Sequence, residues 1–112
     1  MNPPAKILLV EDDSAIVATL RRVLADEGYE VAIEKTGNGG LDRAKENPFD
    51  AVITDLKLPG LSGLELVREL HAARPRLPIA ARIVEKHGGA LQYRNLAQGG
   101  AAFGIILPVF KS

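Results

Sequence analysis

The 112-residue sequence contains no cysteine, and its 14 basic and 14 acidic residues leave a formal net charge of zero. Without cysteine, disulfides, thiolate metal sites and thiol nucleophiles are all excluded. The balanced charge gives no basic field that would attract nucleic acid or an anionic membrane. No apolar run reaches the roughly 20 residues that span a bilayer, and the N-terminal MNPPAK lacks the apolar segment of a signal peptide. We therefore expect a cytoplasmic protein that binds neither nucleic acid nor membrane.

The apolar content is that of an ordinary globular protein, at 46% of the chain. A chain of this length is large enough for one domain with a sizeable core. No internal repeat or low-complexity linker marks a boundary, so we predict a single domain over residues 1–112.

Short apolar runs alternate with segments of helical periodicity along the first part of the chain. The expected strands are residues 6–10 (KILLV), 29–35 (YEVAIEK) and 49–54 (FDAVIT). The expected helices run from an N-cap at Asp13 or Ser14 to Gly28, over about residues 41–46, and from a Ser62–Glu65 capping box to just before Pro75. This alternation predicts an α/β fold with a parallel sheet, and residues 29–35, whose polar and apolar residues alternate, suit its edge.

Residues 77–92, LPIAARIVEKHGGALQ, continue this pattern in an unusual way. Pro78 suits a first helical turn and Gly88 a C-terminal cap. The apolar residues between them have helical spacing, which predicts a helix whose opposite face carries Arg82 in solvent. Two strands are expected to follow as an antiparallel hairpin, at residues 90–96 and 101–109.

Acidic residues follow two of the expected buried strands. Glu11 and Asp12 come after the first strand, and Asp55 comes after the strand at residues 49–54. If these strands are parallel neighbours, the three carboxylates share one crevice, where a bound cation such as Mg²⁺ would relieve their repulsion. A carboxylate beside such an ion can attack a phosphoryl group. Asp12 or Asp13 alone would more simply cap a helix, but Asp55 precedes a loop, so capping does not account for it.

ILLVEDD at residues 7–13 and AVITDLKLPGLSGLELV at residues 51–67 together resemble the receiver domain of two-component response regulators. The resemblance covers about residues 5–79. It implies a flavodoxin-like, CheY-like three-layer fold in a cytoplasmic phosphoprotein of a phosphorelay. It further implies that Asp55 accepts a phosphoryl group from a histidine kinase or phosphotransfer protein. By the same resemblance Glu11, Asp12, Asp55 and the backbone carbonyl of Lys57 hold Mg²⁺.

The sequence departs from the receiver pattern after about residue 79. Receivers continue with a fourth strand ending in Ser or Thr and a fifth ending in Lys-Pro, and both polar residues contact the phosphoryl group. Neither has a counterpart here, and Leu107 stands where Lys would precede Pro108. Lys86 and Lys111 are better interpreted as solvated surface charges. Switching is therefore expected to be impaired.

Residues 80–109 instead resemble the end of histidine-kinase ATP-binding domains, where a helix ending in HGG leads into a hairpin that finishes in Leu-Pro. The chain is thus expected to be chimeric. It lacks the asparagine-bearing helix and the DxGxG loop of those domains, so we expect no ATP binding. Gly99 and Gly100 are better interpreted as a turn.

Two functions remain. The first is a receiver module that is phosphorylated on Asp55 with the help of Mg²⁺ and is not itself an enzyme. The second is a pseudo-receiver, an interaction or oligomerisation module that no longer switches. The hairpin would leave an exposed sheet edge, which favours pairing into a homodimer.

Overall fold

Eight elements follow one another along residues 4–84 and 91–95, the part of the chain that the computed structural model describes. The strands are β1 (Lys6–Val10), β2 (Glu30–Glu34), β3 (Ala51–Asp55), β4 (Ile79–Val84) and β5 (Leu91–Asn95). The helices are α1 (Ser14–Asp26), α2 (Gly37–Glu46) and α3 (Gly63–Ala73). The strands form one sheet in the order β2-β1-β3-β4-β5, in which the first four are parallel and β5 runs antiparallel to β4. The predicted α/β fold is confirmed, with β2 at an edge as its alternating sequence indicated.

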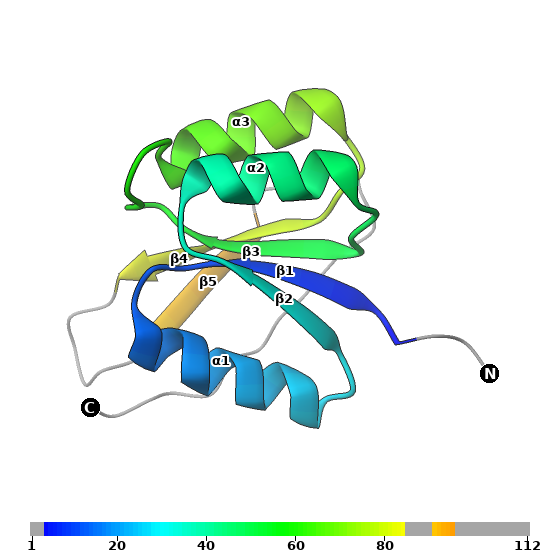
Figure 1. Cartoon of the computed structure of the whole chain (residues 1–112), viewed down its shortest axis with the longest axis vertical. Coiled ribbons are helices and arrows are strands. Elements are labelled where there is room, and N and C mark those ends of the chain that lie inside the picture. Colours follow the sequence, from blue (N-terminus) through cyan, green and yellow to red (C-terminus); the bar gives the residue numbers. More distant parts are fainter. Residues whose placement is uncertain (1–3, 85–90, 96–112) are drawn as a thin grey trace.

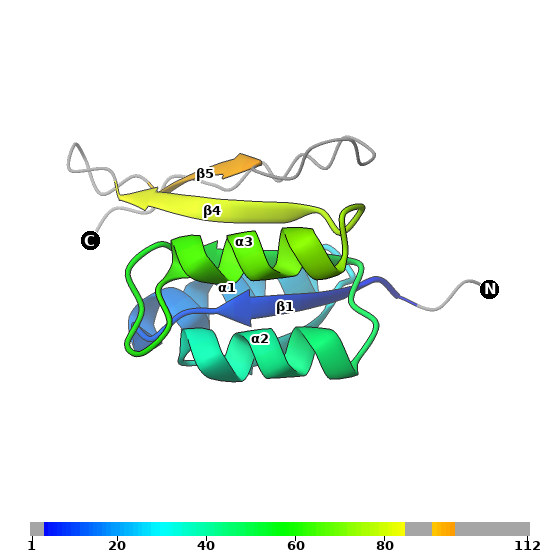
Figure 2. The ribbon, with the colours of Figure 1, turned by 90° about the horizontal axis from the view of Figure 1, so that it is seen from above.

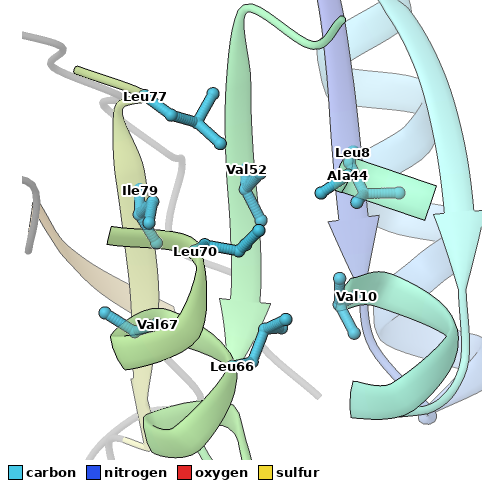
Figure 3. Close-up of a cluster of buried hydrophobic side chains, with 9 residues drawn as sticks. All are labelled: Leu8, Val10, Ala44, Val52, Leu66, Val67, Leu70, Leu77 and Ile79. Atoms are coloured by element: carbon cyan, nitrogen blue, oxygen red, sulfur yellow. The ribbon is translucent and has the colours of Figure 1, made fainter. Parts of the chain in front are cut away.

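The helices cover the sheet as two outer layers, with α1 on one face and α2 and α3 on the other (Figures 1 and 2). Successive side chains of a strand point to opposite faces, so β1 contributes Leu8 and Val10 to one core and Ile7 and Leu9 to the other. Figure 3 shows the core on the α2 and α3 side, formed by Leu8, Val10, Ala44, Val52, Leu66, Val67, Leu70, Leu77 and Ile79. The core on the α1 side contains Ile7, Leu9, Leu20, Leu24, Ala51, Ile53 and Ala80. Each buried Leu or Ile stabilises the fold by about 1.5–3 kcal/mol before the entropy cost of ordering it.

Side-chain caps fix where the helices begin. Asp13 accepts hydrogen bonds from the backbone N–H groups of Ala15 and Ile16, and Ser62 accepts one from Glu65, as predicted for α1 and α3. Helix α2 begins at Gly37, four residues before its expected start. The cause is Thr36, whose hydroxyl accepts a hydrogen bond of 3.0 Å from the N–H of Gly39 and so caps a helix that opens on glycines.

The helix predicted from Pro78 to Gly88 is wrong over residues 79–84, which form strand β4. This strand is parallel to β3 in the register Val52↔Ile79 to Asp55↔Arg82. The spacing of the apolar residues suits a helix. However, Ile79, Ala80 and Ala81 are all buried, and the first polar side chain of the segment is Arg82. A short apolar run buried on both faces fits an inner parallel strand, and pairing with β3 satisfies its backbone hydrogen bonds.

The structure describes only some of the residues that follow β4 in the predicted hairpin. Strand β5 lies within the first predicted strand of the hairpin, residues 90–96, and pairs with β4. The second predicted strand, residues 101–109, and the end of the predicted helix lie outside the described residues. Among the described helices, none is long and apolar enough to cross a membrane.

Candidate functional site

The register of the sheet brings charged side chains together where three neighbouring strands end. Leu9, Ile53 and Ala80 lie side by side on β1, β3 and β4, and all three belong to the core under α1. Two residues further along each strand, on the same face, come Glu11, Asp55 and Arg82. An apolar row across the sheet is thus followed by a charged row at its carboxyl edge, which is where ligands bind in open α/β sheets.

The three predicted carboxylates meet at this edge. Glu11, Asp12 and Asp55 each offer a carboxylate oxygen, and these oxygens all lie within 4.8 Å of one another. Glu11 and Asp55 are buried, with 1% and 5% of their surface exposed, whereas Asp12 is exposed. Asp13, the alternative cap, takes the capping role and leaves Asp12 for the crevice.

The carboxylates fit a small hard cation. Mg²⁺ holds its oxygen ligands at about 2.0–2.1 Å, so two ligands on one ion lie at most about 4.2 Å apart. Small side-chain movements would therefore bring the three oxygens onto one ion. The N–H of Lys57 donates to Asp55 Oδ1 at 3.2 Å, which places the Lys57 backbone beside the site. Its carbonyl as a fourth ligand stays a prediction.

Arg82 is the functional residue that sequence reasoning missed. Its Nε donates to Glu11 Oε1 at 2.9 Å, and its Nη2 donates to Asp55 Oδ2 at 2.7 Å and to Glu11 Oε2 at 3.4 Å. Arg82 is 7% exposed, so the expected solvent-facing position is wrong. The error follows from the helix prediction, because a strand at residues 79–84 places Arg82 on the same face as Ala80. The available signal was a lone charge within the otherwise apolar run of residues 77–84.

Burial raises the pKa of Glu11 above its ordinary value of 4.5, because the charged carboxylate loses water. The N–H of Asp13, which donates to Glu11 Oε2 at 3.1 Å, and the charge and hydrogen bond of Arg82 all favour the charged form and oppose the rise. The negative charge of Asp55 adds to it. The raised pKa marks Glu11 as a carboxylate that a further cation would stabilise.

The loop between Asp55 and α3 is held close to the site by glycine. The N–H of Gly63 donates to the carbonyl of Leu56 at 3.1 Å, and a Cβ at Gly63 would collide with the carbonyl oxygen of Asp55. Gly60 has φ +75°, a backbone conformation that favours glycine. Asn38 on α2 accepts a hydrogen bond of 2.9 Å from the N–H of Leu61. The loop that follows Asp55 is thus hydrogen-bonded to α2 through Asn38 and packed closely against the start of α3 at Gly63.

Comparison with known proteins identifies one family over most of the chain. The family model of the response regulator receiver domain matches residues 7–102. The uncharacterized transcriptional regulatory protein YkoG of Bacillus subtilis (strain 168) is 44% identical over 73 residues, which are 65% of this chain and 32% of that protein. The response regulator MprA of Mycobacterium sp. (strain KMS) is 42% identical over 76 residues, 68% of this chain and 33% of that protein. The matches therefore span about a third of the length of these relatives.

Solved receiver structures have the same fold. The receiver domain of the sensor histidine kinase PA1611 from Pseudomonas aeruginosa PAO1, which holds a magnesium ion in its active site cleft, matches with a TM-score of 0.67. The two chains are 32% identical, and the match covers 70% of this chain and 66% of that one. The chemotaxis response regulator CheY4 of Vibrio cholerae matches with a TM-score of 0.66 and 31% identity, over 70% of this chain and 67% of that one. The expected flavodoxin-like fold is confirmed.

Proposed function

Because this chain belongs to the family of response regulator receiver domains, we propose that it accepts a phosphoryl group on Asp55 from a histidine kinase or phosphotransfer protein. The observation that carries the proposal is the meeting of Asp55 with Glu11 and Asp12, whose carboxylate oxygens lie within 4.8 Å of one another. In this proposal the chain receives the group and is not an enzyme that acts on other molecules.

The residues of the site have separate roles in this transfer. An oxygen of Asp55 attacks the phosphorus atom, an acyl phosphate O–P bond forms, and the bond from phosphorus to the donor breaks, leaving its electron pair on the donor. Glu11, Asp12, Asp55 and the carbonyl of Lys57 would hold Mg²⁺, which supplies positive charge against the incoming phosphoryl oxygens. The buried edge of the sheet fixes the position of Asp55, and the hydrogen bond from Lys57 N–H orients its carboxylate.

We further propose that switching is impaired. Strand β4 reads IAARIV and contains neither Ser nor Thr, and strand β5 reads LQYRN and contains no Lys. The side chains that report the phosphoryl group in receivers are therefore missing from these two strands. Phosphorylation can still occur, because the attacking carboxylate and its metal ligands all lie before β4.

The proposal is tested by intact mass spectrometry after incubation with acetyl phosphate and Mg²⁺. We expect a phosphoryl adduct on the wild type that is absent from Asp55→Asn and absent when Mg²⁺ is removed by EDTA. Asp26→Asn is the matched control, since Asp26 is exposed and ends α1, far along the helix from its start beside the site. An adduct that persists in Asp55→Asn would contradict the proposal.

The second candidate is a pseudo-receiver that acts by contact alone. The ion pairs of Arg82 favour it, because they already supply positive charge to Glu11 and Asp55 without a metal ion. In this case no adduct forms, and the protein associates into a homodimer. Size-exclusion chromatography with light scattering measures the association, and a monomer at all concentrations would remove the homodimer from this candidate.

We propose that the similarity of residues 80–109 to the end of a histidine-kinase ATP-binding domain concerns the origin of this segment and does not indicate a nucleotide-binding function. Because β4 belongs to the parallel sheet, residues 79–84 are part of the receiver fold and not of an added helix. We propose that the chain does not bind ATP, and isothermal calorimetry that detected micromolar binding would contradict this.

A further inference from the structure

Arg82 contacts both buried carboxylates of the candidate metal site, at 2.9 Å to Glu11 Oε1 and 2.7 Å to Asp55 Oδ2. The same two carboxylates are proposed ligands of Mg²⁺. We propose that the guanidinium of Arg82 competes with the divalent cation for these carboxylates, holding them in the metal-free protein and releasing at least one when the cation binds. This inference rests on the proposed function for the identity of the cation.

The four oxygens of the two buried carboxylates all accept hydrogen bonds. Glu11 Oε1 accepts from Arg82 Nε, and Glu11 Oε2 accepts from the N–H of Asp13. Asp55 Oδ2 accepts from Arg82 Nη2, and Asp55 Oδ1 accepts from the N–H of Lys57. A cation that binds both side chains therefore meets donors already present at these oxygens, and those of Arg82 carry a positive charge that repels it.

Arg82 cannot avoid this conflict by losing its proton. Arginine stays protonated at any pH that the protein tolerates, so its positive charge remains in the site. The backbone of Arg82 is fixed by pairing with Asp55 across β3 and β4, so only the side chain can withdraw. Three carboxylates and one guanidinium leave two negative charges, enough to attract one divalent cation but fewer than the three that a site without Arg82 would present.

The inference is tested by calorimetric titration of Mg²⁺ into three proteins. Removing the charge in Arg82→Gln is expected to strengthen Mg²⁺ binding at least about tenfold relative to wild type. Arg82→Lys keeps a cation on β4, so its affinity is expected to stay below that of Arg82→Gln. The matched control is Arg74→Gln, which removes the same charge at the opposite end of α3, where Arg74 bonds the carbonyl of Lys45. Its affinity should equal that of wild type.

Unchanged or weaker Mg²⁺ binding in Arg82→Gln would overturn the inference. So would a gain of the same size in Arg74→Gln, because the effect would then come from net charge and not from the site. Circular dichroism of each variant with saturating Mg²⁺ verifies that the proteins compared are folded.

A second measurement uses only the wild type and so does not depend on whether a variant folds. The Nε–H of Arg82 donates to a buried carboxylate, which should give a resolved and slowly exchanging resonance in an arginine ¹⁵N–¹H correlation spectrum. Saturation with Mg²⁺ is expected to shift this resonance and speed its exchange with water. A resonance that is unaltered while the carboxylates bind Mg²⁺ would overturn the inference.

These measurements separate the inference from the proposed function. If Asp55 is phosphorylated but Mg²⁺ affinity does not depend on Arg82, the inference fails and the function stands. If Mg²⁺ affinity rises in Arg82→Gln but no adduct forms on Asp55 in any of the proteins, the proposed function fails and the competition stands.

Discussion

At the scale of single residues, the site is governed by the balance between two buried carboxylates and one buried guanidinium. Breaking a buried ion pair by removing one partner costs about 3–5 kcal/mol, because the remaining charge keeps its desolvation cost without its partner. Arg82 pairs with both Glu11 and Asp55, so its removal affects two such charges.

We therefore predict that Arg82→Gln lowers the free energy of unfolding of the metal-free protein by about 3–5 kcal/mol. Added Mg²⁺ should raise the melting temperature of this variant more than that of wild type, because the cation replaces the missing charge. Thermal and urea denaturation with EDTA or Mg²⁺ measure both effects. A metal-free variant as stable as wild type would show that the ion pairs seen here do not stabilise the fold.

The raised pKa of Glu11 predicts a pH dependence of stability. Because the folded-state pKa lies above the unfolded-state value near 4.5, the folded protein binds more protons in the interval between the two pKa values. The contribution of Glu11 to stability therefore falls as pH rises from below 4.5 through the folded-state pKa. Urea denaturation in EDTA should show that wild type loses stability relative to Glu11→Gln over this interval. A difference that is constant with pH would contradict the prediction, and Glu69→Gln, on the exposed surface of α3, is the control.

At the scale of elements, the site depends on how closely α3 follows the end of β3. Gly63, the first residue of α3, lies against the backbone carbonyl of Asp55, where no side chain fits. The end of the strand and the start of the helix are therefore in direct contact, and a change that separates them would displace Asp55.

Gly63→Ala is predicted to lower the free energy of unfolding by about 1–3 kcal/mol, because the added Cβ meets backbone atoms that cannot turn away. The variant should also yield less phosphoryl adduct on Asp55 in the mass assay. Gly39→Ala is the control, since an added Cβ there meets only the ends of the Glu34 and Thr36 side chains. Equal effects of the two substitutions would show that close packing at Gly63 has no particular role.

Elements with a local signal could be predicted from the sequence, apart from the start of α2, whereas β4, which is decided by distant contacts, could not. Asp13 and Ser62 mark the starts of α1 and α3 because their caps are formed within three residues. The prediction for residues 79–84 is wrong because their apolar spacing fits a helix. They form a strand because they pair with β3, whose residues are distant in the sequence. The site followed the same division: its carboxylates could be predicted from their motifs, whereas Arg82 depended on β4.

At the scale of the whole molecule, the formal net charge is zero, but charged residues gather at the carboxyl edge of the sheet. The sheet order places β1 between β2 and β3, so the ends of β1, β3 and β4 gather Glu11, Asp55 and Arg82 from positions up to 71 residues apart. Apolar cores on both faces of the sheet, packed under the helices, support this edge (Figure 1). The function proposed for the chain lies in that edge, where a phosphoryl group, a divalent cation and Arg82 would share the same carboxylates.

The measurement that tests this account most directly locates the phosphoryl group on the chain. Borohydride reduces an acyl phosphate to an alcohol and leaves free carboxylates unchanged, so a phosphorylated aspartate becomes homoserine and is found by peptide mass mapping. After incubation with acetyl phosphate and Mg²⁺, the account predicts homoserine at position 55 and at no other aspartate. Homoserine elsewhere, or at position 55 without Mg²⁺, would contradict it.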